Sequence, residues 1–230
     1  MRKGLATAAS DAAPRRGRWA GMPIADRKAE RRELILQAAF DLLGTEGWSA
    51  TTVRAVIEHT GLNPRYFYES FSGLDELVVA VYDHVVEQLG KLVVDALDSA
   101  TDPESQVRAV VQATVDFVDE DRRRGRVLYH EGLGSEALNV RRVEASHAVV
   151  AFIEQYAAER GSAPAAGDPI GRVGAAVVVG GFSRLLTDWL DGRIAVSKDT
   201  LVEDATELFL ALGDAAGGIA LRRRAKRRGR

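Results

Sequence analysis

The sequence predicts an all-α protein with an N-terminal three-helix helix-turn-helix domain followed by a larger helical domain. Apolar residues recur at spacings of three and four in segment after segment, whereas the alternating pattern of strands is scarce. Short groups of Gly, Pro, Asp and Ser separate these segments, as expected of helices joined by turns. With 230 residues, of which 46% are hydrophobic, the chain is long enough for one small and one larger domain.

Several classes of protein are disfavoured by what the sequence lacks. There is no cysteine, which excludes disulfides, thiolate metal sites and cysteine nucleophiles. The glycine-rich phosphate loops and the serine nucleophile motif are missing, and the four histidines are scattered, so we expect no enzyme, cofactor or metal site. No run approaches the roughly 18 apolar residues of a membrane span, and the start lacks a signal peptide. We therefore expect a cytoplasmic protein without a membrane partner.

Charge is distributed unevenly along the chain, although the formal net charge is only -2. Residues 1–26 hold five Lys or Arg against two Asp, and residues 222–230 hold seven and no acid. The residues between them hold 19 basic and 31 acidic side chains. An acidic body with two basic ends is therefore predicted.

Four segments follow from these patterns. Residues 1–26 lack apolar periodicity and are rich in Ala, Gly, Pro and Arg, so we expect a disordered basic arm. The helix-turn-helix domain is assigned to 27–73, with a first helix over 27–43 that Gly residues terminate. The larger helical domain covers 74–216, and 217–230 is expected to be a disordered basic tail.

The second helix of the N-terminal domain is predicted to begin after a threonine cap. Either Thr51 or Thr52 suits that position, because a threonine hydroxyl can accept a hydrogen bond from the first turn. Val53, Val56 and Ile57 follow at helical spacing and share one face, which must pack on a neighbouring helix.

A third helix is expected only two residues after the second one ends. Gly61 can take the left-handed conformation that closes a helix, and Asn63 and Pro64 suit the cap and first turn of the next. Phe67 and Phe71 lie four residues apart and are predicted to face inward. This leaves an outward surface composed of Pro64, Arg65, Tyr66, Tyr68 and Glu69.

The combined pattern resembles the N-terminal domain of TetR-family transcriptional repressors. The matching runs are Ile35 to Leu43, Gly47 to Val53, Gly61 to Asn63 and Tyr66 to Phe71, with their spacings intact over about 50 residues. The resemblance implies a homodimer that binds double-stranded operator DNA and a small-molecule inducer. One departure is Leu74, which stands where family members often carry a lysine that contacts phosphate.

The third helix would enter the major groove, and its side chains are the candidates for reading bases. Arg65 is suited to the O6 and N7 atoms of guanine, and Tyr66 to a thymine methyl group or a phosphate. Tyr68 and the two threonines are expected at phosphates. The full predicted set comprises Thr51, Thr52, Arg54, Asn63, Pro64, Arg65, Tyr66 and Tyr68.

The predicted domain has little overall attraction to a polyanion. Residues 27–76 hold six basic and eight acidic side chains. We therefore hypothesise that Arg15, Arg16 and Arg18 in the arm supply part of the electrostatic attraction. A glycine corner between two helices also occurs in domains that bind no nucleic acid, so the alternative is a helical small-molecule-binding or scaffold protein without specific DNA recognition.

The larger domain is expected to bind the inducer between its helices, predicted at 74–97, 103–119, 123–132, 136–160, 169–191 and 200–214. An apolar pocket with a few polar anchors is typical of small-molecule sites. Each candidate taken singly is better explained as ordinary core. The candidates are Tyr82, Phe117, Tyr129, His147, Phe152 and Phe182.

A dimer interface is predicted on the last two helices. Small residues in 169–191 allow close approach of helices, and large apolar residues follow them. A two-fold dimer also suits a palindromic operator, with half-sites about 34–36 Å apart or a multiple of that distance. The alternative is that these side chains pack only within one chain. The predicted interface comprises Phe182, Leu185, Trp189, Leu201, Leu208 and Phe209.

Overall fold

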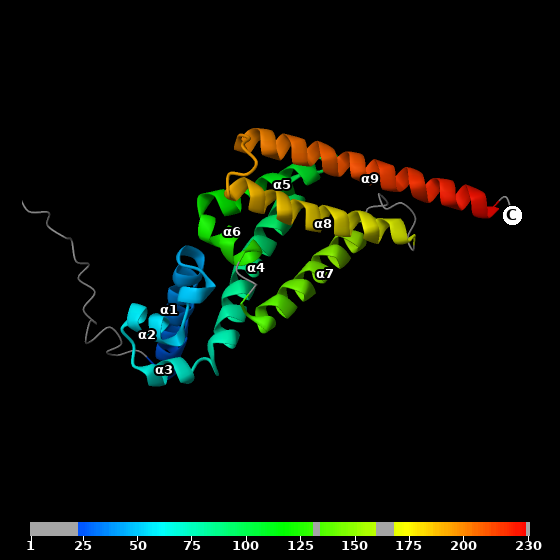
Figure 1. The fold of residues 1–230 in the computed structure, drawn as a ribbon. Coiled ribbons are helices and arrows are strands. Elements are labelled where there is room, and N and C mark those ends of the chain that lie inside the picture. Colours follow the sequence, from blue (N-terminus) through cyan, green and yellow to red (C-terminus); the bar gives the residue numbers. More distant parts are fainter. Residues whose placement is uncertain (1–22, 131–133, 160–167, 229–230) are drawn as a thin grey trace, which may run out of the picture.

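A computed structural model describes residues 23–130, 134–159 and 168–228, and this part of the chain contains helices and no strand. Figure 1 shows a small N-terminal group of helices joined by a long helix to a larger group. The predicted all-α class is confirmed. The elements are α1 (Ile24–Thr45), the 3-10 helix η1 (Trp48–Ala50), α2 (Val53–Thr60), α3 (Pro64–Tyr68), α4 (Leu74–Ser99), α5 (Pro103–Glu120), α6 (Arg122–Tyr129), α7 (Glu136–Glu159), α8 (Pro169–Leu190) and α9 (Lys198–Arg228).

The N-terminal group has its own apolar core. Ile35 and Leu43 of α1, Val56 of α2 and Phe67 of α3 are each no more than 1% exposed. Phe71, directly after α3, is buried beside them. This core confirms the inward faces that the sequence predicts for the three helices. The first helix begins at Ile24, three residues earlier than expected, and Arg15, Arg16 and Arg18 lie outside the described residues.

The long helix α4 connects this group to the rest of the molecule (Figure 1). Its first turn is held by Glu76, whose carboxylate accepts hydrogen bonds from the Ser72 hydroxyl at 2.6 Å and from the Ser72 backbone N–H at 2.7 Å. These bonds lower the pKa of Glu76. Leu74 packs against the core as a partly buried side chain.

The larger group consists of α5 to α9 arranged around the upper part of α4. Helices α8 and α9 run side by side at the end of the molecule opposite α3, and α7 packs against α4 and α8 (Figure 1). The short helix α6 contacts α1, α4, α5 and α8. It therefore packs against helices of both groups.

The expectation of a disordered tail over 217–230 is wrong for the described residues, because α9 continues to Arg228. Ala, Leu, Arg and Lys are strong helix formers, and cations near a helix C-terminus interact favourably with its dipole. Arg223 also forms a 2.7 Å ion pair with Asp168, the N-cap of α8. A run of like charges suggests disorder, but these residue types also favour a helix.

Helix α8 is the one described helix long and apolar enough to cross a membrane by length and composition alone. A single helix of this kind is weak evidence of a membrane span, because apolar helices of soluble proteins pass the same test. Only 11% of its apolar window is buried within the chain.

Two glycines allow α6 to approach its neighbours closely. A Cβ on Gly44 of α1 would lie less than 3.0 Å from Cβ of Arg123, and a Cβ on Gly125 of α6 would lie equally close to Cδ1 of Leu190 in α8. Both distances are far below a normal carbon contact. The two positions therefore tie α6 to the N-terminal helices on one side and to α8 on the other.

Gly44→Ala should push α1 and α6 apart and lower the free energy of unfolding by about 1–3 kcal/mol, as overpacking generally does. Gly90→Ala is the matched control, because Gly90 is an exposed helical residue and a Cβ added there would have no neighbour within 4 Å. That change should stabilise the protein by about 0.5–1 kcal/mol. Urea unfolding measures both, and equal effects of the two substitutions would contradict the close approach.

Candidate DNA-binding surface

The corner between α2 and α3 has the local structure that the sequence predicts. Thr52 caps α2, its hydroxyl accepting a hydrogen bond from the Ala55 N–H at 3.1 Å. Gly61 ends α2 in the left-handed region with φ 64°. Asn63 caps α3 by accepting from the Arg65 N–H at 2.9 Å, and Pro64 occupies the first turn. These contacts fix the angle at which α3 leaves α2.

The side chains of α3 divide into a buried and an exposed set. Phe67 packs against Phe71 with ring centroids 6.0 Å apart, and both are in the core. Tyr68 lies edge-on to Phe67 but remains 62% exposed, and the Arg65 side chain is 81% exposed. Pro64 and Asn63 are exposed on the same short helix. The structure therefore presents one end and one side of α3 to solvent.

Each arginine of this surface is paired with a glutamate one turn later. The Nε atom of Arg65 lies 2.7 Å from Oε1 of Glu69, and Nε of Arg54 lies 2.7 Å from Oε1 of Glu58. The hydrogen bond from Arg54 to Glu58 raises the pKa of Arg54. Exposed pairs of this kind are weak, so a phosphate or a guanine can compete for the guanidinium group.

Thr51 does not belong to the exposed surface, and its predicted phosphate contact is contradicted by its burial. Its side chain is 1% exposed, and its hydroxyl donates to the Gly47 carbonyl at 2.8 Å. The hydroxyl thus stabilises the turn around η1. The sequence contains two adjacent threonines for one capping position, and only Thr52 is exposed.

Two arginines of α1 reach this surface, a contact that the sequence did not predict. The Arg31 guanidinium lies 4.1 Å from the Tyr66 ring centroid, and that of Arg32 lies 4.7 Å from the Phe71 ring centroid. Arg31 covers one face of Tyr66, which is half-buried. Cation–π contacts of this type hold positive charge beside α3. Their signal in the sequence was limited to basic residues at the start of the first helix.

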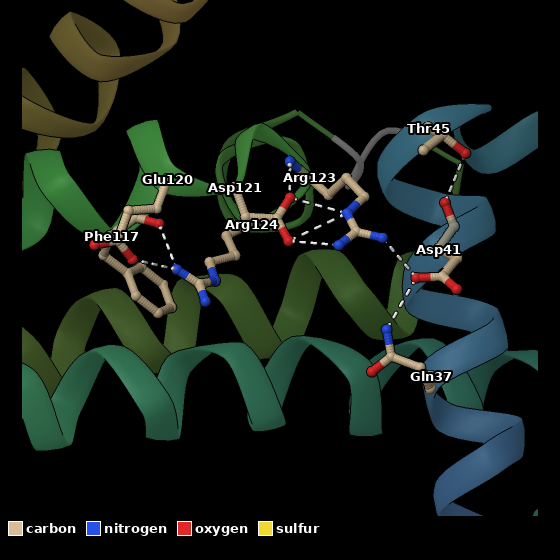
Figure 2. Close-up of polar contacts among 8 residues, drawn as sticks. All are labelled: Gln37, Asp41, Thr45, Phe117, Glu120, Asp121, Arg123 and Arg124. Carbon is tan, nitrogen blue, oxygen red and sulfur yellow. Dashed lines mark hydrogen bonds and ion pairs between the residues drawn. The ribbon is translucent and has the colours of Figure 1, made fainter.

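The junction between α1 and α6 is built around Arg123 (Figure 2). Its guanidinium donates to Asp121 at 2.7 Å and to Asp41 of α1 at 2.8 Å. Asp41 also accepts a hydrogen bond from Gln37 at 2.9 Å, while its carbonyl accepts from Thr45. The bonds from Arg123 lower the pKa of Asp121. A single cation thus bridges two carboxylates from the two groups of helices.

Two further hydrogen bonds join the same regions. Arg126 of α6 donates to the Thr45 carbonyl at the end of α1 at 2.7 Å. Ser135, just before α7, donates to Asp75 in the first turn of α4 at 2.8 Å. The DNA-binding candidate surface is therefore attached to the larger group of helices at α1 and at the start of α4.

The predicted ligand-binding residues do not converge on one site within the described part of the chain. Tyr82 and Phe117 are buried in the core, and burial raises the pKa of both Tyr82 and Tyr129. His147 and Phe152 are exposed on α7, which contradicts their placement in an enclosed pocket. The apolar residues of α7 recur with little periodicity, so the sequence does not show which side of this helix faces its neighbours. Among the described residues, no group of three potential metal ligands occurs.

The predicted interface residues are also mainly internal. Leu201 is 2% exposed in the core, so its assignment to a dimer interface is wrong. Phe182 and Phe209 pack edge to face within the chain at 5.2 Å, and Trp189 donates its indole N–H to the Val196 carbonyl. Leu185 is partly buried against the same core. Leu208, by contrast, is 65% exposed. Large exposed apolar residues that were not predicted at an interface are Val173, Val177 and Leu221.

Comparison with known proteins identifies the N-terminal group of helices. A family described as "Bacterial regulatory proteins, tetR family" matches residues 35–81, which span the end of α1 to the start of α4. These residues are therefore similar to the regulatory proteins of the TetR family. The match includes α2, α3 and the beginning of α4. It therefore contains the runs on which the resemblance in the sequence was based.

The curated proteins that match this chain are named as transcription regulators. The HTH-type transcriptional activator FasR of Mycolicibacterium smegmatis is 30% identical over 107 residues, which are 46% of this chain and 49% of that protein. The BetI regulator of Brucella canis is 27% identical over 90 residues, or 39% and 46% of the two chains. The matches thus span about half the length of these curated relatives.

The likeness of fold to solved structures extends over most of the chain. A putative TetR-family regulator from Syntrophomonas wolfei has a TM-score of 0.68 at 15% identity, covering 80% of this chain and 95% of its own. The multidrug binding protein EbrR, solved with imidazole, has a TM-score of 0.59 at 21% identity, covering 79% and 94%. The larger group of helices therefore shares its fold with proteins of this type.

Arg123→Ala should lower the free energy of unfolding by about 1–2 kcal/mol at neutral pH, because two carboxylates lose a charged hydrogen-bond donor. The lowered pKa of Asp121 means that its contribution is complete above the ordinary aspartate pKa of about 3.9 and is lost as the pH falls through the folded value. The difference between variant and wild type should therefore shrink below about pH 4.

Chemical unfolding at several pH values measures this difference. Arg172→Ala is the control, because Arg172 forms an exposed ion pair with Glu154 at 3.1 Å and should change stability by less than about 0.5 kcal/mol. A difference for Arg123→Ala that persists unchanged at acidic pH would show that Asp121 does not contribute through its charge.

Proposed function

We propose that this protein is a DNA-binding transcriptional regulator that acts as a homodimer in the cytoplasm. The observation that carries the proposal is the outward surface of α3, where Arg65 and Tyr68 are exposed above a core of Phe67 and Phe71. A helix supported from beneath, with exposed donors near its N-terminus, has the form needed to read base edges in the major groove. We expect phosphate contacts from Thr52, the exposed N-cap of α2, and from Arg54, exposed in its first turn.

The second part of the proposal is release from a palindromic operator by a small, largely apolar molecule, which makes the protein a repressor. The larger group of helices has an apolar interior that includes the buried phenol groups of Tyr82 and Tyr129. Such polar tips in apolar surroundings are suited to orient a ligand. EbrR, a protein of similar fold, is described as a multidrug binding protein, which supports a ligand role for these helices.

Helix α6 offers a route from a bound molecule to the DNA surface. It is closely packed on α8 at Gly125 and on α1 at Gly44, and Arg123 joins it to Asp41. A ligand that favours one position of α6 would change the position of α1 and, with it, α3. The ligand would thereby alter the separation of two α3 helices in a dimer.

Arg65→Ala should weaken binding to operator DNA by about tenfold to a hundredfold, because a bidentate contact to guanine contributes about 1–3 kcal/mol. Arg184→Ala is the matched control, since Arg184 forms an equivalent ion pair with Asp188 one turn later but lies on α8. Fluorescence anisotropy with the intergenic DNA upstream of the gene measures both. Equal affinities for the two variants would contradict the role of α3.

Glu69→Gln should have the opposite effect to Arg65→Ala, because it removes a negative charge and frees the Arg65 guanidinium. We expect tighter binding to DNA and a steeper fall of affinity with salt. The slope of log K against log salt concentration should steepen by up to about 0.9 for each additional phosphate bound. Binding that is weak, independent of sequence and insensitive to these changes would favour the alternative function, a helical ligand-binding or scaffold protein.

A further inference from the structure

The side of α1 that faces the N-terminal core continues into two arginines. Arg31 lies one turn before Ile35, which is 1% exposed. Arg32 lies one turn before Leu36, which is 4% exposed. Residues four apart lie on the same side of a helix, so both arginines stand where the buried side of α1 meets solvent. Long cationic side chains at such an edge pack their carbon stems on the protein and keep the charged group at the rim.

The two arginines cover two aromatic rings that differ in their access to solvent. The guanidinium group of Arg31 lies 4.1 Å from the ring centroid of Tyr66, and that of Arg32 lies 4.7 Å from the ring centroid of Phe71. Phe71 is 2% exposed, so its ring belongs to the core and is closed to DNA. Tyr66 is half-buried, so part of it remains open to a partner. One contact therefore serves packing alone, whereas the other supports a residue of the candidate DNA-binding surface.

Tyr66 is held by its backbone as well as by its ring. Its N–H donates to the Asn63 carbonyl at 2.9 Å, and its carbonyl accepts a hydrogen bond from the Ser70 hydroxyl at 3.1 Å. The cation of Arg31 over the ring then restricts the side-chain torsions. Tyr68, the other tyrosine of α3, is 62% exposed. Tyr66 is therefore the tyrosine of α3 whose ring has a fixed position before DNA binds.

A fixed ring favours one of the two DNA contacts that suit a tyrosine near the start of α3. The hydroxyl group could bind a phosphate, or the ring could pack on the methyl group of a thymine. A hydrogen bond from the tip of a long side chain tolerates rotation of the ring. A packing contact does not, because a gap of only about 0.5–1 Å loses a quarter to a half of the attraction. Holding the ring in place therefore benefits the methyl contact.

We propose that Arg31 is a positioning residue that holds the Tyr66 ring against the methyl group of a thymine in the operator. Arg31 acts through the ring and does not itself touch the base. The preference for thymine at that base pair then depends on α1 as well as on α3. The inference rests on the DNA-binding regulator of the proposed function and adds a residue that determines its sequence preference.

Removal of thymine methyl groups from DNA tests the contact directly. The probe is a duplex selected from a random-sequence library by the full-length wild-type chain, together with the same duplex synthesised with deoxyuridine in place of every thymidine. Deoxyuridine lacks the methyl group but pairs with adenine in the same way. We define the thymine ratio as the dissociation constant of the deoxyuridine duplex divided by that of the thymidine duplex. One packed methyl group contributes about fourfold, so two half-sites should give the wild-type chain a ratio of about tenfold or more.

Four variants of the full-length chain, measured by fluorescence anisotropy, show whether Arg31 acts through Tyr66. Tyr66→Ala gives the thymine ratio without the ring, and Arg31→Gln should lower the ratio to nearly the same value. The double variant should have no lower ratio than Tyr66→Ala alone. Tyr66→Phe should keep the wild-type ratio, because it retains the ring. Both dissociation constants in a ratio come from one preparation, so the ratio does not depend on the fraction of chains that are folded.

Arg32→Gln is the matched control. It removes the same charge from the next residue of α1 and breaks the same kind of contact, but with a ring that lies in the core. The lost charge should weaken binding to both duplexes alike, because phosphates are the same in each. The thymine ratio of Arg32→Gln should therefore stay at the wild-type value. Arg31→Lys should recover part of the ratio, because an ammonium group attracts the ring face but does not stack on it.

The outcomes separate this inference from the proposed function. A wild-type chain that enriches no sequence from the library would contradict sequence-specific DNA binding and the inference with it. Specific binding in which Arg31→Gln keeps the wild-type thymine ratio, or lowers it no more than Arg32→Gln does, would overturn the inference alone. A Tyr66→Phe variant that binds both duplexes as weakly as Tyr66→Ala would also overturn it, because Tyr66 would then act through its hydroxyl group.

Discussion

The close approach of α1 and α6 at Gly44 is the constraint on which the arrangement of this protein depends. With no side chain at Gly44, the backbone of α1 can lie against the first carbons of Arg123, and the Arg123 guanidinium then reaches Asp41. Arg126 adds a hydrogen bond to the Thr45 carbonyl at the end of α1, and Ser135 adds one to Asp75 at the start of α4. A small DNA-binding candidate domain with its own core is thereby held in one orientation on a much larger group of helices.

Local chemistry explains which parts of the fold and of the candidate site the sequence could predict. The corner at Gly61 and Asn63, and the inward pair Phe67 and Phe71, depend on backbone preferences and helical spacing within a few residues. Contacts between distant segments had no such local signal. The position of Arg31 over Tyr66 depends on how α1 crosses α3, which the spacing of apolar residues does not determine.

The incorrect predictions share one physical origin, which is that residue type does not specify the direction of a side chain. Thr51 and Thr52 are adjacent and chemically identical, yet the turn at η1 buries one and exposes the other. Leu201 and Leu208 both suit an interface and lie two turns apart along nearly the same side of α9, yet Leu201 is 2% exposed and Leu208 is 65% exposed. The aromatic and polar residues chosen for a pocket were likewise divided between the core and the surface of α7.

The glutamates that pair with Arg54 and Arg65 have a consequence for how such a protein would search a genome. Each of these arginines already has a counterion one turn away, so contact with a random stretch of phosphates replaces one ion pair by another. Little free energy is released in that exchange, and residence on unrelated DNA should be brief. A guanine in the right place offers two hydrogen bonds that a single carboxylate contact does not match. The acidic neighbours would thus improve discrimination by shortening the time lost at wrong sites.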